Sequence, residues 1–290
     1  MFSHEFVRNA FVAGTPISLA CGLVGYFVVL RAQVFAGDAL THVAFTGAVA
    51  AAAAGVDTRV GLFAATLLIA TALAGLGDRA HPDDVTIGIM FAWVLGLGVF
   101  FLALFSAGAG GGNGLLGART LFGSIFGLSG ADARLAAAIG IAIILAILAI
   151  ARPLLFASGD PTVAAARGVP VRVLGLLTLL LLAATTAEAT QAVGALLLLG
   201  LLAAPAGAAT RLSANPYVAL GLSGVLAVGS MWAGLTLSYL VPGLPPSSAI
   251  IAVASGLYLL AFVLTSEIRL GARIGGRLGV GGTVSRGTEN

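Results

Sequence analysis

Long apolar runs recur from one end of this 290-residue chain to the other, and they constrain its fold more than any motif does. Hydrophobic residues make up 59% of the sequence and charged residues only 9%, whereas a soluble domain carries about a quarter charged residues. The runs are continuous, unlike the roughly ten-residue alternating segments of a transmembrane β-barrel. The sequence therefore predicts an all-α, polytopic transmembrane helical bundle built as one domain.

The apolar runs divide into about nine spans, because a membrane-crossing helix needs about 20 apolar residues. Eight helices is the alternative, since only a few polar residues separate some of the later runs. The expected spans are 9–30, 38–55, 59–77, 84–105, 132–151, 171–190, 192–210, 216–240 and 247–265.

Arginines in the connecting segments predict the orientation of the bundle, because cytoplasmic loops carry the excess of basic residues. With the N-terminus outside, ten arginines fall on the inner side and four on the outer side. The inner set is Arg31, Arg79, Arg152, Arg167, Arg172, Arg211, Arg269, Arg273, Arg277 and Arg286, and the outer set is Arg8, Arg59, Arg119 and Arg134. We expect an N-out, C-in protein of the cell's inner (plasma) membrane.

Lysine is absent, and this excludes several functions. A P-loop needs Lys to reach the nucleotide phosphates, so an energy source based on ATP must lie in another subunit. Schiff-base catalysis is excluded for the same reason, and no HExxH or GxSxG pattern is present. Arginines at helix ends indicate membrane topology, not nucleic-acid binding. We therefore expect a transport subunit that is not an enzyme and binds no cofactor permanently.

Asp38 and His42 are the strongest candidates for chemistry in this charge-poor chain. At positions i and i+4 of a helix their side chains share one face, and ionisable groups inside a membrane are costly enough to indicate function. A carboxylate with an imidazole suits Mn(II), Zn(II) or Fe(II). The spacing alone slightly favours another reading, in which Asp38 caps the second helix and His42 bonds a neighbouring carbonyl.

Two further ionisable residues are weaker metal candidates. Glu188, near the outer end of the sixth expected span, could be an entry ligand, although a solvated outer-loop carboxylate is favoured. His81 could contact a metal on the inner face. Asp83 and Asp84 beside it fit the first turn of a helix, where the helix dipole favours carboxylates. Gating or hinge roles are assigned to Gly47, Gly123, Gly194 and Pro205, the last of which is expected to break its helix.

Three stretches outside the spans have their own expected roles. Residues 121–129 follow a Gly-rich outer loop at 106–118 and are too short to span; they form either a re-entrant helix or an interfacial one. In the inner segment 152–172, Ser158 or Asp160 can cap a short helix that starts at Pro161 and ends at Gly168. Residues 1–266 are the membrane domain, and 267–290 form a basic Gly/Arg-rich tail, expected to be disordered near anionic headgroups.

Five segments in order resemble the permeases of metal-uptake ABC transporters, the ABC-3 family. The second expected helix carries G-D-A-L-T-H with Gly47, similar to the family's G-D-x-x-S-H-x-x-x-x-G signature. The other matches are D-V-T-I-G-I-M-F at 84–91, L-F-G-S-I at 121–125, residues 156–168 with Asp160, Ala164 and Gly168, and Q-A-V-G followed by Pro205 and Ala206 at 191–206. Thr41 replaces the usual Ser, Thr46 the usual Pro, and the last outer loop at 242–250 departs from the family pattern.

The resemblance implies a fold like that of type II ABC importers and a homodimer with two cytoplasmic ATPase subunits and an extracytoplasmic metal-binding protein. It implies that Asp38 and His42 contact zinc, manganese or iron during import, and that the segment with Asp160, Ala164 and Gly168 docks on the ATPase. Two alternatives remain: a permease for a chelate such as a siderophore or cobalamin, and an ATP-independent secondary transporter.

Overall fold

The computed structural model describes residues 4–77, 83–108, 121, 123–196, 198–241 and 243–279. Helices account for all the regular structure of these residues. In chain order they are α1 (Glu5–Leu30), α2 (Val34–Ala53), α3 (Thr58–Leu76), α4 (Asp84–Gly108), the 3₁₀ turn η1 (Ile125–Gly127), α6 (Gly130–Gly159), α7 (Pro161–Ala166), α8 (Val171–Val193), α9 (Leu198–Leu212), α10 (Pro216–Leu240) and α11 (Pro246–Gly279).

Eight of these helices are long and apolar enough to cross a membrane, so the predicted polytopic bundle is confirmed. The seventh expected span is α9, which has 15 residues and reaches only about 22 Å at 1.5 Å per residue. That is shorter than a hydrocarbon core of about 30 Å. The eight-helix alternative therefore describes the bundle better, with α9 as a shorter ninth element.

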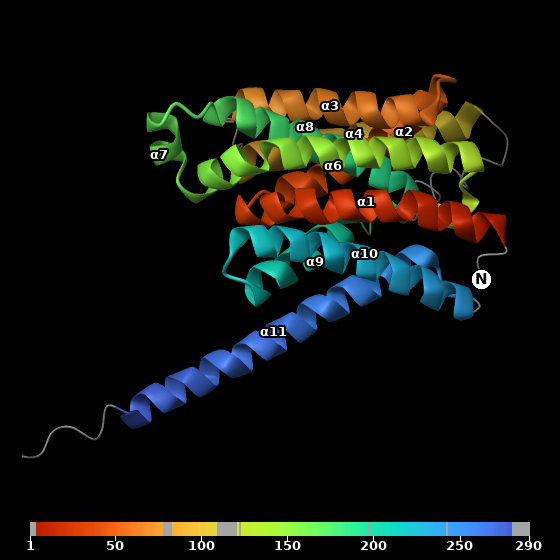
Figure 1. Cartoon of the computed structure of the whole chain (residues 1–290). Coiled ribbons are helices and arrows are strands. Elements are labelled where there is room, and N and C mark those ends of the chain that lie inside the picture. The colour runs from red at the N-terminus through yellow and green to blue at the C-terminus, as the bar shows by residue number, and fades with distance from the viewer. Residues whose placement is uncertain are drawn as a thin grey trace, which may run out of the picture.

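Figure 1 shows the long helices side by side, with α7 at one end of the bundle and the N-terminus at the opposite end. Helix α1 runs through the middle and packs against α6, α8, α9 and α10. Its span is 72% buried within the protein, whereas the span of α4 is only 17% buried. The N-terminal helix is therefore the core of the bundle, and α4 is a peripheral helix.

Helices α2 and α3 cross at a pair of glycines. A Cβ atom on Gly47 would lie 2.3 Å from the carbonyl oxygen of Gly61, and one on Gly61 would lie 2.2 Å from that of Gly47. Small residues permit such contact in a bilayer, where association depends on van der Waals packing because lipid is as apolar as the side chains. Gly47 is thus a backbone contact between two helices.

The connection between α8 and α9 begins inside the protein and reaches the surface at Leu196, which is 49% exposed. Gly194 ends α8 with φ +93°, and Ala195 after it is buried. Two backbone hydrogen bonds of 3.2 Å hold the chain before α6 against this turn, from Ser124 N–H to Gln191 O and from Leu196 N–H to Leu121 O. Because lipid offers no hydrogen bonds, irregular backbone at this depth needs such protein partners. We call residues 121 and 123–125 the covering segment.

A re-entrant helix and an interfacial helix were the two forms expected for residues 121–129. Leu121 is helical, and the described residues 123–129 contain one 3₁₀ turn, Ile125–Gly127, and no longer helix. Gly123 has φ +73° and is so close to the end of α8 that a Cβ would lie 2.5 Å from the carbonyl oxygen of Ala192. Within residues 123–129 neither a re-entrant helix nor an interfacial helix forms, because the backbone there packs against the α8–α9 turn.

The expected ends of the fifth and last spans were wrong, and so was the expected break at Pro205. Helix α6 runs through Pro153 to Gly159, so the segment from 152 is mostly helical. Helix α9 continues through Pro205, which is buried and does not break it. Helix α11 runs to Gly279, well past 265, so the first part of the expected tail is helical.

Substitution Gly61→Ala should destabilise the protein by about 1–3 kcal/mol, the usual cost of overpacking a tight contact. The added methyl group must displace the backbone of α2. The matched control is Gly75→Ala on the same helix, where nothing lies within 4 Å of the new Cβ. Thermal unfolding in detergent followed by size exclusion measures both variants. Equal unfolding temperatures would contradict a close α2–α3 crossing.

Candidate functional site

Asp38 and His42 lie in the second and third turns of α2. The helix begins at Val34, with Gln33 at the capping position, so the expectation that Asp38 caps the helix was wrong. Both side chains are half-buried, whereas the residues between and around them on α2 are largely buried. The Thr41 hydroxyl donates to the backbone carbonyl oxygen of Asp38 at 2.7 Å, so this hydrogen bond does not use the Asp38 carboxylate.

An aromatic pair from α2 and α4 borders this site. The ring centroid of Phe91 lies 5.2 Å from that of His42 at an interplanar angle of 63°, and 6.3 Å from that of Phe35. Edge-to-face contacts of this kind fix a ring's position. Phe91 is the last residue of the D-V-T-I-G-I-M-F segment, so two segments of the resemblance meet at His42.

A second contact joins the same two helices one turn further along. The Thr46 hydroxyl donates to the Val94 carbonyl oxygen at 3.1 Å. Thr46 occupies the position of the usual Pro, so this departure from the family pattern adds a hydrogen bond between α2 and α4. Together with the aromatic pair, it holds α2 against α4 from Phe35 to Thr46.

The pair is an incomplete metal site within one chain. Across the described residues, no group of three or more His, Cys, Asp or Glu side chains could hold a metal ion. One carboxylate and one imidazole supply two ligands, fewer than the four to six that transition metals take. His81, the inner-face candidate, lies outside the described residues.

Glu188 does not join this pair, and the expectation of a solvated carboxylate was wrong. Its side chain is 2% exposed and its Oε1 lies 3.3 Å from Nη2 of Arg59. Arg59 also approaches Asp132, with Nη1 3.8 Å from Oδ1. The sequence placed Arg59 only among the outer arginines, because nothing in its spacing links it to a residue 129 positions away.

The other backbone candidates have definite places, although their gating roles stay predictions. Gly47 makes the α2–α3 contact. Gly123 and Gly194 adopt positive φ values and face each other across the α8–α9 turn. Pro205 lies buried within α9. The L-F-G-S-I and Q-A-V-G segments thus meet in space, as the two segments at His42 do.

The short helix α7 forms as the sequence predicts, with Asp160 as its cap. One carboxylate oxygen, Oδ1, accepts the N–H groups of Thr162 and Val163, each at 3.0 Å, and Pro161 is the first helical residue. Gly168 follows the helix with φ +80°, and Ala164 is fully buried against the bundle. The surface that α7 offers to a partner therefore comes from Val163, which is 44% exposed, and its neighbours.

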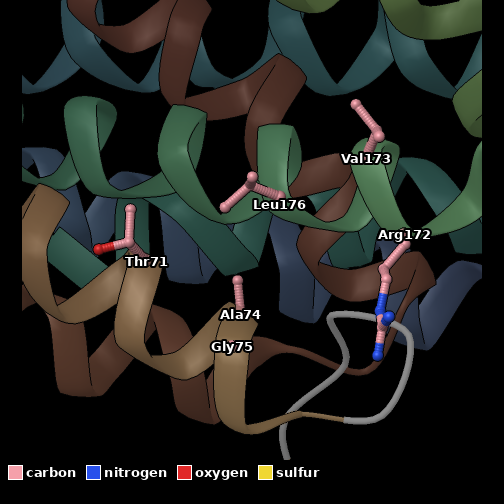
Figure 2. Close-up of a pocket in the computed structure, with 6 residues that line it drawn as sticks. All are labelled: Thr71, Ala74, Gly75, Arg172, Val173 and Leu176. Atoms are coloured by element: carbon pink, nitrogen blue, oxygen red, sulfur yellow. The ribbon is translucent and has the colours of Figure 1, made fainter.

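A cavity of about 550 Å³ opens between α3 and α8 near the α7 end, as Figure 2 shows. Thr71, Ala74 and Gly75 line it from α3, and Arg172, Val173 and Leu176 from α8. Among the described residues, this lining supplies one cationic side chain, Arg172, and no carboxylate, imidazole or thiol.

The fold is that of a multi-span helical membrane protein, with a carboxylate and an imidazole on one face of α2 and a capped surface helix at one end of the bundle. The sequence matches the ABC 3 transport family over residues 3–265. The chain therefore belongs to the ABC 3 transport family, as the five segments predicted.

Individual relatives agree with this assignment. The manganese transport system membrane protein MntC of Halalkalibacterium halodurans is 31% identical over 92% of this chain and 90% of its own length. The manganese import system permease protein ScaB of Streptococcus parasanguinis is 27% identical over 91% and 92%. The solved structure of PsaBC from Streptococcus pneumoniae in complex with Fab matches with a TM-score of 0.76 and 27% identity, over 89% of this chain and 91% of that chain.

Loss of the α7 cap should loosen the surface helix selectively. Asp160→Ala removes the acceptor for two N–H groups, whereas Asp160→Asn keeps a good capping side chain. We expect faster hydrogen exchange of residues 161–167 in the Ala variant only. Unchanged exchange in the Ala variant would contradict the role of the cap.

The same cap should respond to acid. The Thr162 hydroxyl and the Val163 N–H hold the pKa of Asp160 below its ordinary value. Its stabilising contribution is therefore present above the unfolded-state pKa and is lost as the pH falls through the lower folded-state pKa. Exchange at 161–167 measured from neutral pH to about pH 3 checks this direction, with Asp160→Asn as the pH-independent reference.

Proposed function

We propose that this chain is the membrane-spanning permease subunit of an ATP-driven importer of a divalent transition metal, with manganese the first cargo to test. The observation that supports this most directly is the Asp38–His42 pair, half-buried on an otherwise buried helix. Mn(II) accepts both carboxylate oxygen and imidazole nitrogen. The relatives named for manganese transport add support from sequence. Zinc and iron(II) remain the other candidate cargoes.

Two ligands per chain explain why the transporter would work as a homodimer. A second copy related by a twofold axis would bring another aspartate and histidine, giving four ligands around one ion. A set shared between two chains is taken apart when the chains move relative to one another. Such a site binds the metal transiently, as transport requires, and differs from a closed structural site.

The remaining parts of the transporter follow from the family and from α7. Separate cytoplasmic ATPase subunits would dock on the surface of α7, and an extracytoplasmic metal-binding protein would deliver the ion at the opposite end. ATPase closure would push α7 and change the relative position of the two copies, giving alternating access in the plasma membrane. Asp160 and Gly168 fix the two ends of α7, and Ala164 packs it against the bundle.

Removal of either ligand should stop uptake without disturbing assembly. Asp38→Ala or His42→Ala should lower manganese accumulation by at least about 10–100-fold, since second-shell losses alone cost that much. His4→Gln, at an exposed histidine far from α2 in sequence, is the control and should transport normally. Metal content of cells and size exclusion of the purified complex give the two measurements. Full uptake in both variants would favour the chelate permease, whose wider path needs no ionic ligands.

Docking of the ATPase should depend on the exposed side of α7. Val163→Glu places a charge where an apolar contact is expected, so co-purification of the ATPase subunit should fall by about tenfold or more. Ala214→Glu, in the exposed connection between α9 and α10, adds the same charge on the same predicted side and should have no effect. Proton-driven, ATP-independent uptake by the purified chain alone would instead favour a secondary transporter.

A further inference from the structure

Arg59 and Glu188 form a charged contact that the proposed metal path does not use. Glu188 lies near the end of α8 and Arg59 near the start of α3, and their side chains are 2% and 16% exposed. Burying two charges costs several kcal/mol per ion before their attraction is counted. A contact that costly inside a membrane protein calls for a specific role.

Arg59 and Glu188 make fewer hydrogen bonds than a purely structural ion pair would make. Arg59 reaches Oε1 of Glu188 through one nitrogen at 3.3 Å, although its fork can bind a carboxylate with two. Oε2 of Glu188, Nε of Arg59 and Nε2 of Gln191 are buried, and none has a hydrogen-bond partner among the described residues. Buried polar groups are normally hydrogen-bonded, so a partly satisfied group of this kind is costly and calls for an explanation.

Arg59 also has a second carboxylate within reach. Asp132, in the first turn of α6, lies 3.8 Å from Nη1 and its side chain is 53% exposed. An exposed pair of that length contributes little stability. The guanidinium is therefore placed between a buried acceptor on α8 and an exposed acceptor on α6, and it can exchange one for the other through its own side chain.

Glu188 lies at the end of α8 that leads into the α8–α9 turn. Ala187 packs with Ala44 and Ala48 of α2 and Leu62 of α3. One turn beyond Glu188, the Gln191 carbonyl accepts the Ser124 N–H of the covering segment. At its other end, α8 begins at Val171, directly after the connection from α7. Helix α8 thus runs without a break from the connection after α7 to Glu188 and the α8–α9 turn.

We propose that Arg59 is a positioning residue of the transport cycle that holds Glu188, and with it the outer turn of α8, in the closed arrangement and releases it by moving to Asp132. We call Arg59, Glu188 and Asp132 the latch. Its link to transport rests on the proposed function, whereas its effect on the outer turn of α8 does not.

A thiol reporter in the outer turn of α8 tests the latch without requiring transport. Cys21 is the chain's only cysteine, so Cys21→Ala gives a cysteine-free background, and Thr190→Cys places a thiol of similar size at a fully buried position. The full chain in lipid nanodiscs is treated with a membrane-impermeant maleimide. Arg59→Gln with Glu188→Gln removes both charges together, so neither remains buried and unpaired.

The latch predicts that removing the contact with Glu188 and removing Asp132 change the labelling rate at position 190 in opposite directions. The double variant Arg59→Gln/Glu188→Gln should raise the labelling rate at position 190 by about tenfold or more, because local opening becomes easier. Asp132→Asn removes only the alternative acceptor and should lower the rate. Asp57→Asn is the matched control, since Asp57 accepts only the backbone N–H of Arg59 at 2.7 Å and Asn caps equally well.

An unchanged labelling rate in the double variant, or an increase in Asp132→Asn, would overturn the latch. A purely structural pair would lower the yield of folded protein and leave the rate of the folded fraction the same, which also overturns it. A second measurement, metal taken up per ATP hydrolysed by the complete transporter, should fall in the double variant. If labelling responds but the wild-type transporter shows no ATP-driven metal uptake, the proposed function fails and the latch stands.

Discussion

Close approach between helix backbones is the interaction on which the rest of this structure depends. In a bilayer an apolar side chain gains little by leaving lipid for another helix, so a bundle is held by van der Waals contact and by the few polar groups it buries. The reciprocal contact of Gly47 and Gly61 shows this at α2 and α3, and Gly25 of α1 approaches the Leu202 backbone of α9 in the same way. The first crossing fixes α2, and therefore Asp38 and His42, relative to α3, and the second fixes α1 relative to α9.

The helix bundle carries two sets of ionisable groups, Arg59 with Glu188 and Asp38 with His42, and they differ in how their charge is stabilised. Arg59 and Glu188 are buried together and offset one another within one chain. Asp38 and His42 are half-buried, share a face of α2, and have no third ligand among the described residues. The first arrangement suits a contact between helices. The second would leave coordination free for an ion, and this difference distinguishes the two proposed roles, mechanical for the first set and binding for the second.

The sequence predicted the parts of this protein that depend on local pattern. Apolar runs predicted the spans, and capping residues predicted α7, because both signals act over a few neighbouring positions. It failed where packing overrides local preference: a helix was expected to end before Pro153 and another to break at Pro205, yet both prolines lie inside helices that their neighbours hold together. It also misjudged Glu188, since its partner Arg59 is remote in sequence. Asp38 was placed correctly as a candidate but wrongly as a cap, because α2 starts one turn earlier than the charge pattern indicates.

The uninterrupted course of α8 has a mechanical consequence. From Val171 beside α7 to Glu188 the helix measures about 26 Å at 1.5 Å per residue. If α8 tilted as a rigid body about its Val171 end, a tilt of about 5° would displace the Glu188 end by about 2 Å, which is within the range of helix shifts in known conformational switches. A hydrogen bond does not survive a displacement of that size. A small movement at the surface of the bundle would therefore be enough to break a hydrogen bond at its opposite end.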